Sequence, residues 1–314
     1  MKLTSLLRHE VLLAILLAIV LVILSFQSDK FFTMSNLLNQ GRLMTEIGLI
    51  AIAMTFVIAT GGIDLSVGSI LGLTAILTGV FWQNVGLPLP LAAVAAIAVG
   101  TFAGFVNGVI ITRFRVPPLI ATLATLALYR GLAEGISQAR SVRGYPDWFY
   151  VLGQGEVFGV PTQLWLLFVA AVLASIILAY TRWGRTIYAI GNNEVAARFS
   201  GLSVEGTKLA LYTASGFAAA LAAVIFVSRV STTRSDMGTG IELDAITAVV
   251  LGGTSIFGGR GTIAGTIIGL CLIQALKNGL SLAGGKGDGT IMLIGAVLIL
   301  AILVSNLFER SGTR

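Results

Sequence analysis

Long apolar runs recur along the whole chain and are separated by short polar segments. A helix needs about 20 predominantly apolar residues, within a range of about 17–25, to cross the hydrocarbon core of a bilayer. The predicted spans are residues 11–26, 45–60, 65–81, 91–112, 119–137, 163–181, 207–228, 241–254, 261–281 and 290–307. The pattern therefore predicts an all-α, polytopic membrane protein of about ten transmembrane helices.

The run 241–254 departs from this pattern, because it is too short to cross fully and carries Glu242 and Asp244. Backbone that stops inside a membrane must be buried in protein or line a cavity, so we expect a re-entrant segment or a broken helix here. The first run follows a basic N-terminal segment, as the apolar part of a signal peptide would. No small-x-small cleavage site follows it, and we interpret it as the first span.

The distribution of Lys and Arg over the loops weakly favours a cytoplasmic N-terminus. With that orientation, eleven of the 20 basic residues face the cytoplasm. The acids Asp147, Glu156, Asp236 and Asp288 then all lie outside, although acids count little in this rule. The aromatic segment 145–150 indicates an outer membrane interface, since aromatic rings prefer the headgroup level.

A charged, polar segment, residues 180–202, stands between two of the long apolar runs. Its last ten residues predict a short amphipathic helix. Asn192 or Asn193 can cap the start of this helix, because an amide oxygen accepts a hydrogen bond from a free first-turn N–H. Glu194 and Arg198 stand four residues apart in the favoured order, and Gly201 lies where a left-handed residue would end the helix.

The predicted helix has two distinct faces. The apolar face is a stripe formed by Val195, Phe199 and Leu202. The second face bears charge and small side chains, namely Glu194, Ala197, Arg198 and Gly201. A helix of this kind, held in water between two spans, is suited to dock on a partner, and we expect the rest of the chain to move when the partner pushes it.

An internal repeat relates the two halves of the chain. Residues 100–108 and 261–269 share the pattern G-T-x-A-G-x-x-x-G. Glycine at every fourth position gives a smooth helix face that admits a neighbouring backbone, although such patterns also arise by chance in apolar helices. The two copies run in opposite directions across the predicted spans, which indicates an inverted repeat of the kind found in transporters.

Composition agrees with a membrane protein, because 56% of the 314 residues are hydrophobic and 11% are charged. Soluble domains carry about 25% charged residues. One cysteine, Cys271, and one histidine, His9, exclude an intrachain disulfide and a cysteine-based metal site. The net charge of +6 is expected to face anionic lipid and not nucleic acid. We expect residues 1–314 to form a single transmembrane domain, with its main polar loop at about 182–206.

The chain shows none of the catalytic patterns that an enzyme requires, such as H-E-x-x-H or G-x-S-x-G. The segment L-S-L-A-G-G-K at 280–286 lacks both the first Gly and the Ser or Thr of a phosphate-binding loop. No row of carboxylates indicates a proton or sodium relay. We therefore expect no cofactor and no metal, and an energy source supplied by another chain.

Seven polar residues within or beside the spans are candidates for a translocation path or gate: Asp64, Ser66, Asn107, Glu242, Asp244, Gln274 and Asn278. Asp64 and Ser66 can instead cap a turn at the cytoplasmic face or contact a partner. Glu242 and Asp244 either cap a half-helix or lie at the outer mouth. The three amides can exchange hydrogen bonds with a hydroxylated solute or with a neighbouring helix.

Four stretches resemble the permease subunits of bacterial ATP-binding-cassette importers of the ribose type. They are T-G-G-I-D-L-S-V-G-S-I (60–70), I-A-T-L-A-T-L-A-L-Y-R-G (120–131), G-R-T-I-Y-A-I-G-N-N-E-V-A-A-R-F-S-G (184–201) and G-T-G-I-E-L-D-A-I-T-A-V-V-L-G-G-T-S-I-F-G-G-R-G (238–261). The resemblance implies a multi-pass subunit of the bacterial inner membrane that moves a sugar or sugar-like solute by alternating access. It also implies cytoplasmic ATPase subunits, a periplasmic sugar-binding protein and a second permease as partners.

The family's E-A-A-like coupling element falls on the predicted amphipathic helix, with Val195 at a position that is often Ala. The resemblance thus assigns ATPase coupling to Gly191, Asn192, Asn193, Glu194, Val195, Ala196, Ala197, Arg198, Phe199 and Gly201. It implies that the apolar stripe enters a groove of the ATPase while Glu194 and Arg198 set the register at its rim.

Other functions stay open from the sequence. A permease for branched-chain amino acids belongs to a related family, although the stretches I-D-L-S-V-G and G-I-E-L-D-A favour sugars. An ion-coupled carrier should show carboxylates or histidines paired at mid-membrane, of which the chain has few. The sequence does not distinguish a pentose, a deoxyhexose, a hexose and autoinducer-2 as cargo, nor a homodimer from a heterodimer of permeases.

Overall fold

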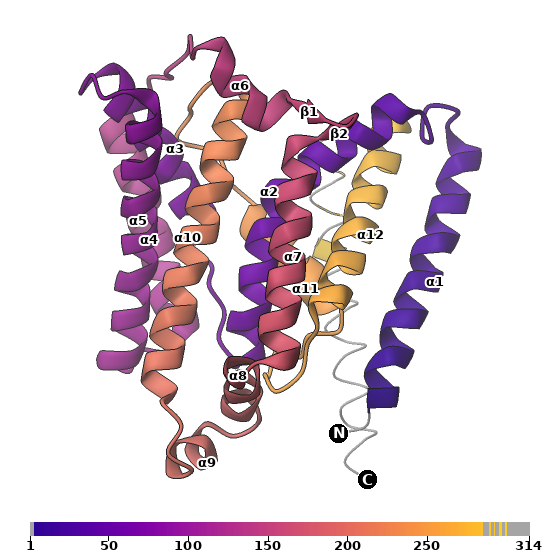
Figure 1. Cartoon of the computed structure of the whole chain (residues 1–314), viewed down its shortest axis with the longest axis vertical. Coiled ribbons are helices and arrows are strands. Elements are labelled where there is room, and N and C mark those ends of the chain that lie inside the picture. The colour runs from indigo at the N-terminus through magenta and orange to yellow at the C-terminus, as the bar shows by residue number, and fades with distance from the viewer. Residues whose placement is uncertain (1–2, 285–288, 290–291, 293–294, 297–298, 300–314) are drawn as a thin grey trace.

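The computed structural model describes residues 3–284 together with 289, 292, 295, 296 and 299, and most of them are helical (Figure 1). The first half contains α1 (Leu3–Gln27), α2 (Met34–Ala59), α3 (Val67–Gln83), α4 (Leu89–Arg113), α5 (Pro118–Ser137) and α6 (Asp147–Gln154). A two-residue hairpin follows, formed by β1 (Glu156–Val157) and β2 (Val160–Pro161). The second half contains α7 (Thr162–Tyr180), α8 (Arg182–Asn192), α9 (Glu194–Phe199), α10 (Val204–Val230), α11 (Ile241–Leu251) and α12 (Ile263–Leu282).

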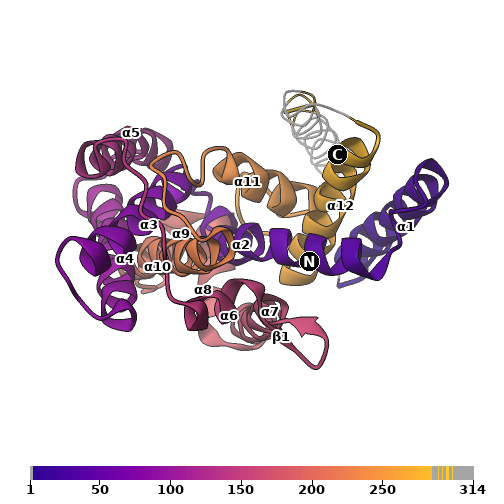
Figure 2. The same cartoon turned by 90° about the horizontal axis from the view of Figure 1, so that it is seen from above.

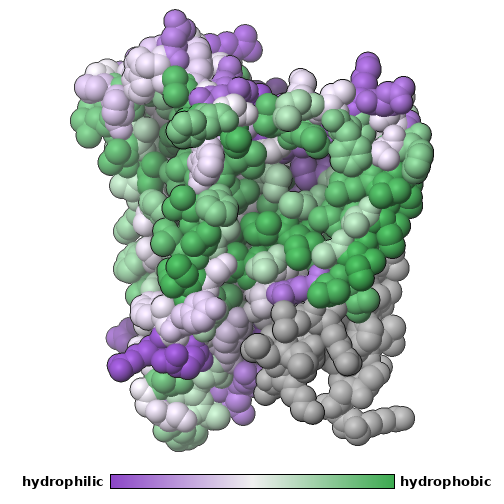
Figure 3. All heavy atoms as spheres, turned by 45° about the vertical axis from the view of Figure 1, so that its right-hand side comes forward, coloured by the Kyte–Doolittle hydropathy of each residue, from purple (hydrophilic) through white to green (hydrophobic). Residues whose placement is uncertain are grey.

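Seven of the described helices are long and apolar enough to cross a membrane, namely α1, α2, α4, α5, α7, α10 and α12. They stand side by side, with α6 at one end of the bundle and α8 and α9 at the other (Figure 1). A broad hydrophobic belt separates two polar ends on the face drawn in Figure 3. These features confirm the predicted all-α, polytopic membrane fold.

Nine of the ten predicted spans correspond to helices, and the tenth, 290–307, lies almost entirely outside the described residues. The predicted start of the second span was wrong, because α2 begins at Met34 and not at residue 45. Thr33 caps this helix by accepting a hydrogen bond from the Asn36 N–H. Polar residues in the first turns of α2 interrupt the apolar run and conceal this start. Helices α6 and α8 were not predicted.

Two non-helical segments interrupt the crossings that end in α3 and α11. Residues 60–66 join α2 to α3, and residues 231–240 join α10 to α11, which has only 11 residues. The broken-helix prediction for 241–254 is thus confirmed. Arg130 of α5 ties the second segment to the first turn of α3, since its guanidinium donates to the carbonyl oxygens of Ser235 at 2.5 Å and Met237 at 2.9 Å, and to that of Gly68 at 3.3 Å.

The repeated glycine pattern lies on α4 and α12, which run in opposite directions. The C-terminal end of α4 and the N-terminal end of α12 both lie at the α8 end of the bundle (Figure 1). A Cβ on Gly104 would lie 2.8 Å from the Gly216 Cα of α10, and one on Gly265 would lie 2.0 Å from the Gly252 carbonyl oxygen. Both copies therefore admit a backbone at close range, and their opposite directions agree with the predicted inverted repeat.

The hydrophobic core is centred on α2, α3 and α10, where Ile50, Met54, Ile70, Tyr212 and Ile225 are fully buried. Helix α1 lies apart at the edge of the molecule, beyond α12 (Figure 2). It joins the molecule through a small separate cluster that includes Leu24 and Ala275. Most other apolar side chains of α1 are exposed, as expected of a helix that faces lipid.

Candidate functional site: an exposed helix and a polar cavity

Helices α8 and α9 form the polar end of the molecule opposite α6 (Figure 1). The Asn193 side chain caps α9 by accepting a hydrogen bond from the Ala196 N–H at 2.9 Å, and its own backbone is extended. Gly201 has φ +78° directly after the helix, a conformation that favours glycine. The predicted helix, its cap and its left-handed stop are therefore confirmed, with α9 limited to Glu194–Phe199.

The two faces of α9 differ in exposure. Val195 is 63% exposed and Phe199 is 89% exposed, so the apolar face points away from the bundle. The prediction that Leu202 extends this stripe was wrong. Leu202 lies beyond the helix and packs instead on a buried cluster with Ile190, Ala197 and Val204. Ala197 is the helix residue that anchors α9 to α8 and α10.

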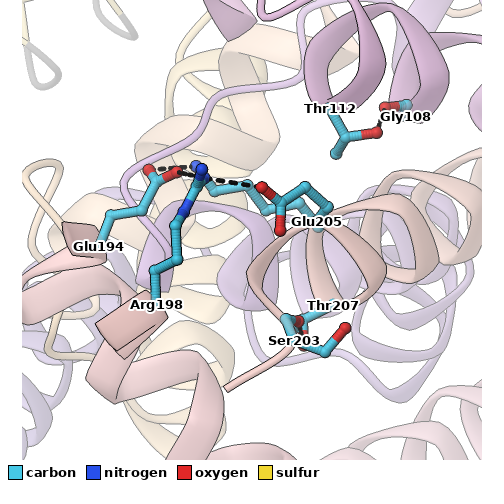
Figure 4. Close-up of polar contacts among 8 residues, drawn as sticks. Gly108, Thr112, Glu194, Arg198, Ser203, Glu205 and Thr207 are labelled. Atoms are coloured by element: carbon cyan, nitrogen blue, oxygen red, sulfur yellow. Dashed lines mark hydrogen bonds and ion pairs between the residues drawn. The ribbon is translucent and has the colours of Figure 1, made fainter. Parts of the chain in front are cut away.

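Ion pairs hold α9 against the first turns of α10 (Figure 4). Glu194 contacts Lys208 at 2.6 Å, and Arg198 contacts Glu205 at 2.8 Å and Glu194 at 3.4 Å. The side chains of Glu194, Arg198 and Glu205 are 42–51% exposed. Each ion pair therefore contributes at most about 1 kcal/mol to the stability of the fold. Glu205 and Lys208 were not predicted to belong to this site. Their Glu-x-x-Lys spacing, directly after the charged loop, is the sequence signal that could have identified them.

The end of α8 contacts two other backbone segments directly. A Cβ on Gly191 would lie 2.0 Å from the Ala59 carbonyl oxygen and 2.3 Å from the Gly259 nitrogen. The Gly259 N–H itself donates to the Ala59 carbonyl at 2.9 Å. Asn192 lies beside Gly259 and donates to the Tyr188 carbonyl oxygen. Gly191 and Asn192 thus pack α8 on the end of α2 and on the loop between α11 and α12.

Tyr188 strengthens the same junction. Its hydroxyl donates a hydrogen bond to the Gly261 carbonyl oxygen at 2.6 Å. Burial, with a smaller contribution from Glu10, raises the pKa of Tyr188 to about 12. The phenol therefore keeps its proton and this bond at any physiological pH.

Three of the predicted path residues form one buried network between helices. Asp64 accepts hydrogen bonds from the Ser66 N–H and hydroxyl at 3.0 and 2.6 Å, and from the Ser215 hydroxyl at 2.8 Å. The Asn107 amide donates to the Ser66 hydroxyl at 2.7 Å. Asp64, Ser66 and Asn107 are all fully buried. The turn-capping interpretation of Asp64 is confirmed, but its placement at the cytoplasmic face was wrong, because the turn lies inside the molecule.

Two other predicted path residues, Gln274 and Asn278, line a polar cavity of about 420 Å³ among α2, α10, α11 and α12. Asp244 lies beside it and pairs with Lys277, a lining residue, at 2.5 Å. Glu242 does not line this cavity, and its carboxylate instead accepts a hydrogen bond from the Gly240 N–H at the start of α11. The predicted path residues therefore divide between a buried network and a cavity.

The other polar residues of this cavity were not among the predicted path residues. Gln40 lies in the second turn of α2, Glu46 lies in the middle of α2, and Arg229 lies near the end of α10. Glu46 and Arg229 are paired at 2.7 Å although 183 positions separate them in the sequence. No cluster of His, Cys, Asp and Glu that could hold a metal occurs in the part of the chain that the structure describes.

A family model described as the permease component of a branched-chain amino acid transport system matches residues 34–302. The ribose import permease protein RbsC of Escherichia coli strain K12 is 41% identical over 298 residues, which cover 93% of this chain and 92% of that protein. The corresponding protein of Bacillus subtilis strain 168 is 40% identical over 290 residues, which cover 92% and 90%.

A further relative is named for a different substrate. The autoinducer 2 import system permease protein LsrD of Escherichia coli O9:H4 (strain HS) is 36% identical over 300 residues, which cover 94% of this chain and 91% of that protein. No solved structure matches the chain. The similarity therefore extends over nearly the whole length of permeases named for ribose and for autoinducer-2.

Proposed function

The chain belongs to the family of transport-system permease components that this model describes, and we propose that its cargo is a sugar or a sugar-like solute. As such a permease it is a multi-pass protein of the bacterial inner membrane, and it works with an ATPase and a periplasmic binding protein. The cargo rests on relatives named for ribose and autoinducer-2 that match more than nine-tenths of the chain. A branched-chain amino acid, which the family description names, is the second candidate.

The single observation that carries the coupling mechanism is the exposed apolar face of α9. Val195 and Phe199 of α9 are 63% and 89% exposed, and α9 lies at the polar end of the bundle. We propose that they enter a groove of the ATPase, as an amphipathic helix does when it binds a groove of its partner. The ion pairs to α10 and the contact of Gly191 with Ala59 then carry the movement of α9 into the bundle.

A second permease is also part of the proposal. Helices α4, α5 and α7 present large apolar side chains to the outside, which suits lipid and a second copy alike. We propose a pair of permeases, identical or related, with the solute crossing by alternating access when the ATPases close. In this mechanism ATP is hydrolysed by the partner subunits.

The test is ATP-dependent uptake of labelled ribose into vesicles that contain the permease, the ATPase and the binding protein. Phe199→Asp places a charge on the docking face and should abolish both ATPase association in a pull-down and uptake. Phe158→Asp is the matched control for ATPase association, because Phe158 is 94% exposed in the turn between β1 and β2, at the end of the molecule opposite α9. Uptake that persists in the Phe199 variant, or without the ATPase, contradicts this mechanism and favours an ion-coupled carrier.

A further inference from the structure

The polar cavity opens near the α6 end of the bundle, where Gln154 of α6 donates a hydrogen bond to the Arg229 carbonyl oxygen. Three of its polar side chains are more than nine-tenths buried, those of Glu46, Gln274 and Asn278. Burying polar groups costs free energy unless they are hydrogen-bonded. A cavity lined by several such groups between apolar helices costs more free energy to bury than an apolar contact among the same four helices would.

Amide side chains form a ladder along one wall. The Gln274 amide donates to the Gln40 side-chain oxygen at 2.6 Å, and the Gln40 amide donates to the Asn278 side-chain oxygen at 2.9 Å. This arrangement leaves the Gln274 oxygen and the Asn278 nitrogen without a hydrogen-bond partner among the described residues. The Gln274 oxygen is a free acceptor and the Asn278 nitrogen is a free donor, one helical turn apart on α12. A hydroxyl group can donate to the first and accept from the second.

The charged groups of the cavity are balanced. Glu46 pairs with Arg229 at 2.7 Å, and Lys277 pairs with Asp244 at 2.5 Å. Asp244 lies beside the lining, and with its charge included the site has no net charge, so it favours a neutral solute over a phosphate, a carboxylate or a metal cation. Phe226 adds an apolar surface beside these polar groups, and the Arg229 guanidinium lies 4.8 Å from its ring centre.

We propose that this cavity is a binding site for a neutral polyhydroxylated solute of monosaccharide size, and that Gln274 and Asn278 hold its hydroxyl groups. This site rests on the proposed function. It is where the solute released by the binding protein would first bind, within a single permease chain. Only two free amide groups take part, so binding is weak and the solute can leave toward the other side.

The test uses the complete transporter in vesicles with labelled ribose, rhamnose and galactose as probes. Gln274→Leu and Asn278→Leu keep the bulk of each side chain but remove its hydrogen-bonding groups. Each should slow ATP-dependent uptake about tenfold, while ATPase association and the hydrolysis rate with loaded binding protein change less than about twofold. Gln83→Leu is the matched control, because Gln83 is exposed at the end of α3, away from the cavity.

Occupancy of the cavity is measured separately from transport. Cys271 is the only cysteine, so Cys271→Ser with Ser281→Cys leaves one thiol on the cavity wall. In the permease–ATPase complex without binding protein, millimolar concentrations of the transported sugar should slow the reaction of this thiol with a maleimide. The same sugar should have no effect once Gln274→Leu is added.

The outcomes separate the two proposals. Absence of uptake of every probe by the wild-type transporter would contradict the proposed cargo, whereas the thiol reaction would still report whether any of the three sugars enters the cavity. Wild-type uptake rates in both leucine variants, or a thiol reaction that no sugar slows, would overturn the binding site. Equal loss of uptake and ATPase association would assign Gln274 and Asn278 a structural role and overturn it as well.

Discussion

A buried carboxyl group needs hydrogen-bond donors in place of water, and Asp64 obtains them from two neighbouring elements. One oxygen accepts from Ser66 at the start of α3, and the other accepts from Ser215 of α10. Ser66 in turn accepts from Asn107 of α4. A single side chain therefore fixes the non-helical segment 60–66 against two helices.

Replacing Asp64 should destabilise the protein strongly. Asp64→Ala removes the acceptor of the Ser66 and Ser215 hydroxyl protons in the interior, and we expect the free energy of unfolding to fall by about 2–4 kcal/mol. The midpoint of unfolding by SDS in detergent micelles measures this change. Asp29→Ala is the control at an exposed carboxylate in the loop before α2, and it should shift the midpoint little. An equal shift in both variants would contradict the structural role of Asp64.

At the scale of elements, the contact between α8 and the end of α2 has no side chain in it. Gly191→Ala would place a methyl group 2.0 Å from the Ala59 carbonyl oxygen, and backbone on both sides leaves little room to yield. Because the end of α8 must then move, and α9 with it, we expect ATP-dependent uptake to fall about tenfold or more.

Gly131→Ala is the control for this substitution, because Gly131 lies within α5 and a Cβ there would meet no atom within 4 Å. Its uptake and its ATPase association should equal those of the wild type. Wild-type uptake by the Gly191 variant would show that α9 works independently of the contact with α2.

The sequence predicted these elements unevenly, for physical reasons. Apolar runs and the glycine pattern are local signals, so most spans and the opposite directions of the two glycine patterns were predicted correctly. The Asn193 cap and the Gly201 stop are local as well. The polar wall of the cavity was not predicted, since Gln40 lies in a part of α2 too polar to look like a span.

Long-range contacts account for most of what the sequence did not reveal. In the sequence, Glu46 and Arg229 are isolated charged residues within or beside apolar runs. Only the fold brings them together as an ion pair. The same holds for Arg130, whose partners are backbone carbonyl oxygens of the segment 231–240 and of the first turn of α3. Inward placement of Leu202 depends on Ile190 and Val204, which belong to other helices.

At the scale of the whole molecule, the two proposed working surfaces lie at opposite ends. The exposed stripe of α9 lies at one end, and the polar cavity opens near α6 at the other. Arg130 joins the segment 231–240, which leads into α11, to the first turn of α3. An importer needs such a division, because the binding protein delivers solute on one side of the membrane while the ATPase acts on the other.

This division requires one orientation in the membrane, with α9 in the cytoplasm and α6 in the periplasm. In a Cys271→Ser background, Asp147→Cys should react with a membrane-impermeant maleimide added to intact spheroplasts. Ser200→Cys should react only after the membrane is opened, because Ser200 directly follows α9. Both positions are exposed, so a difference in labelling reports the side of the membrane and not burial. The reverse pattern would place the exposed stripe of α9 outside, where no ATP-driven partner could reach it, and would overturn the proposed coupling.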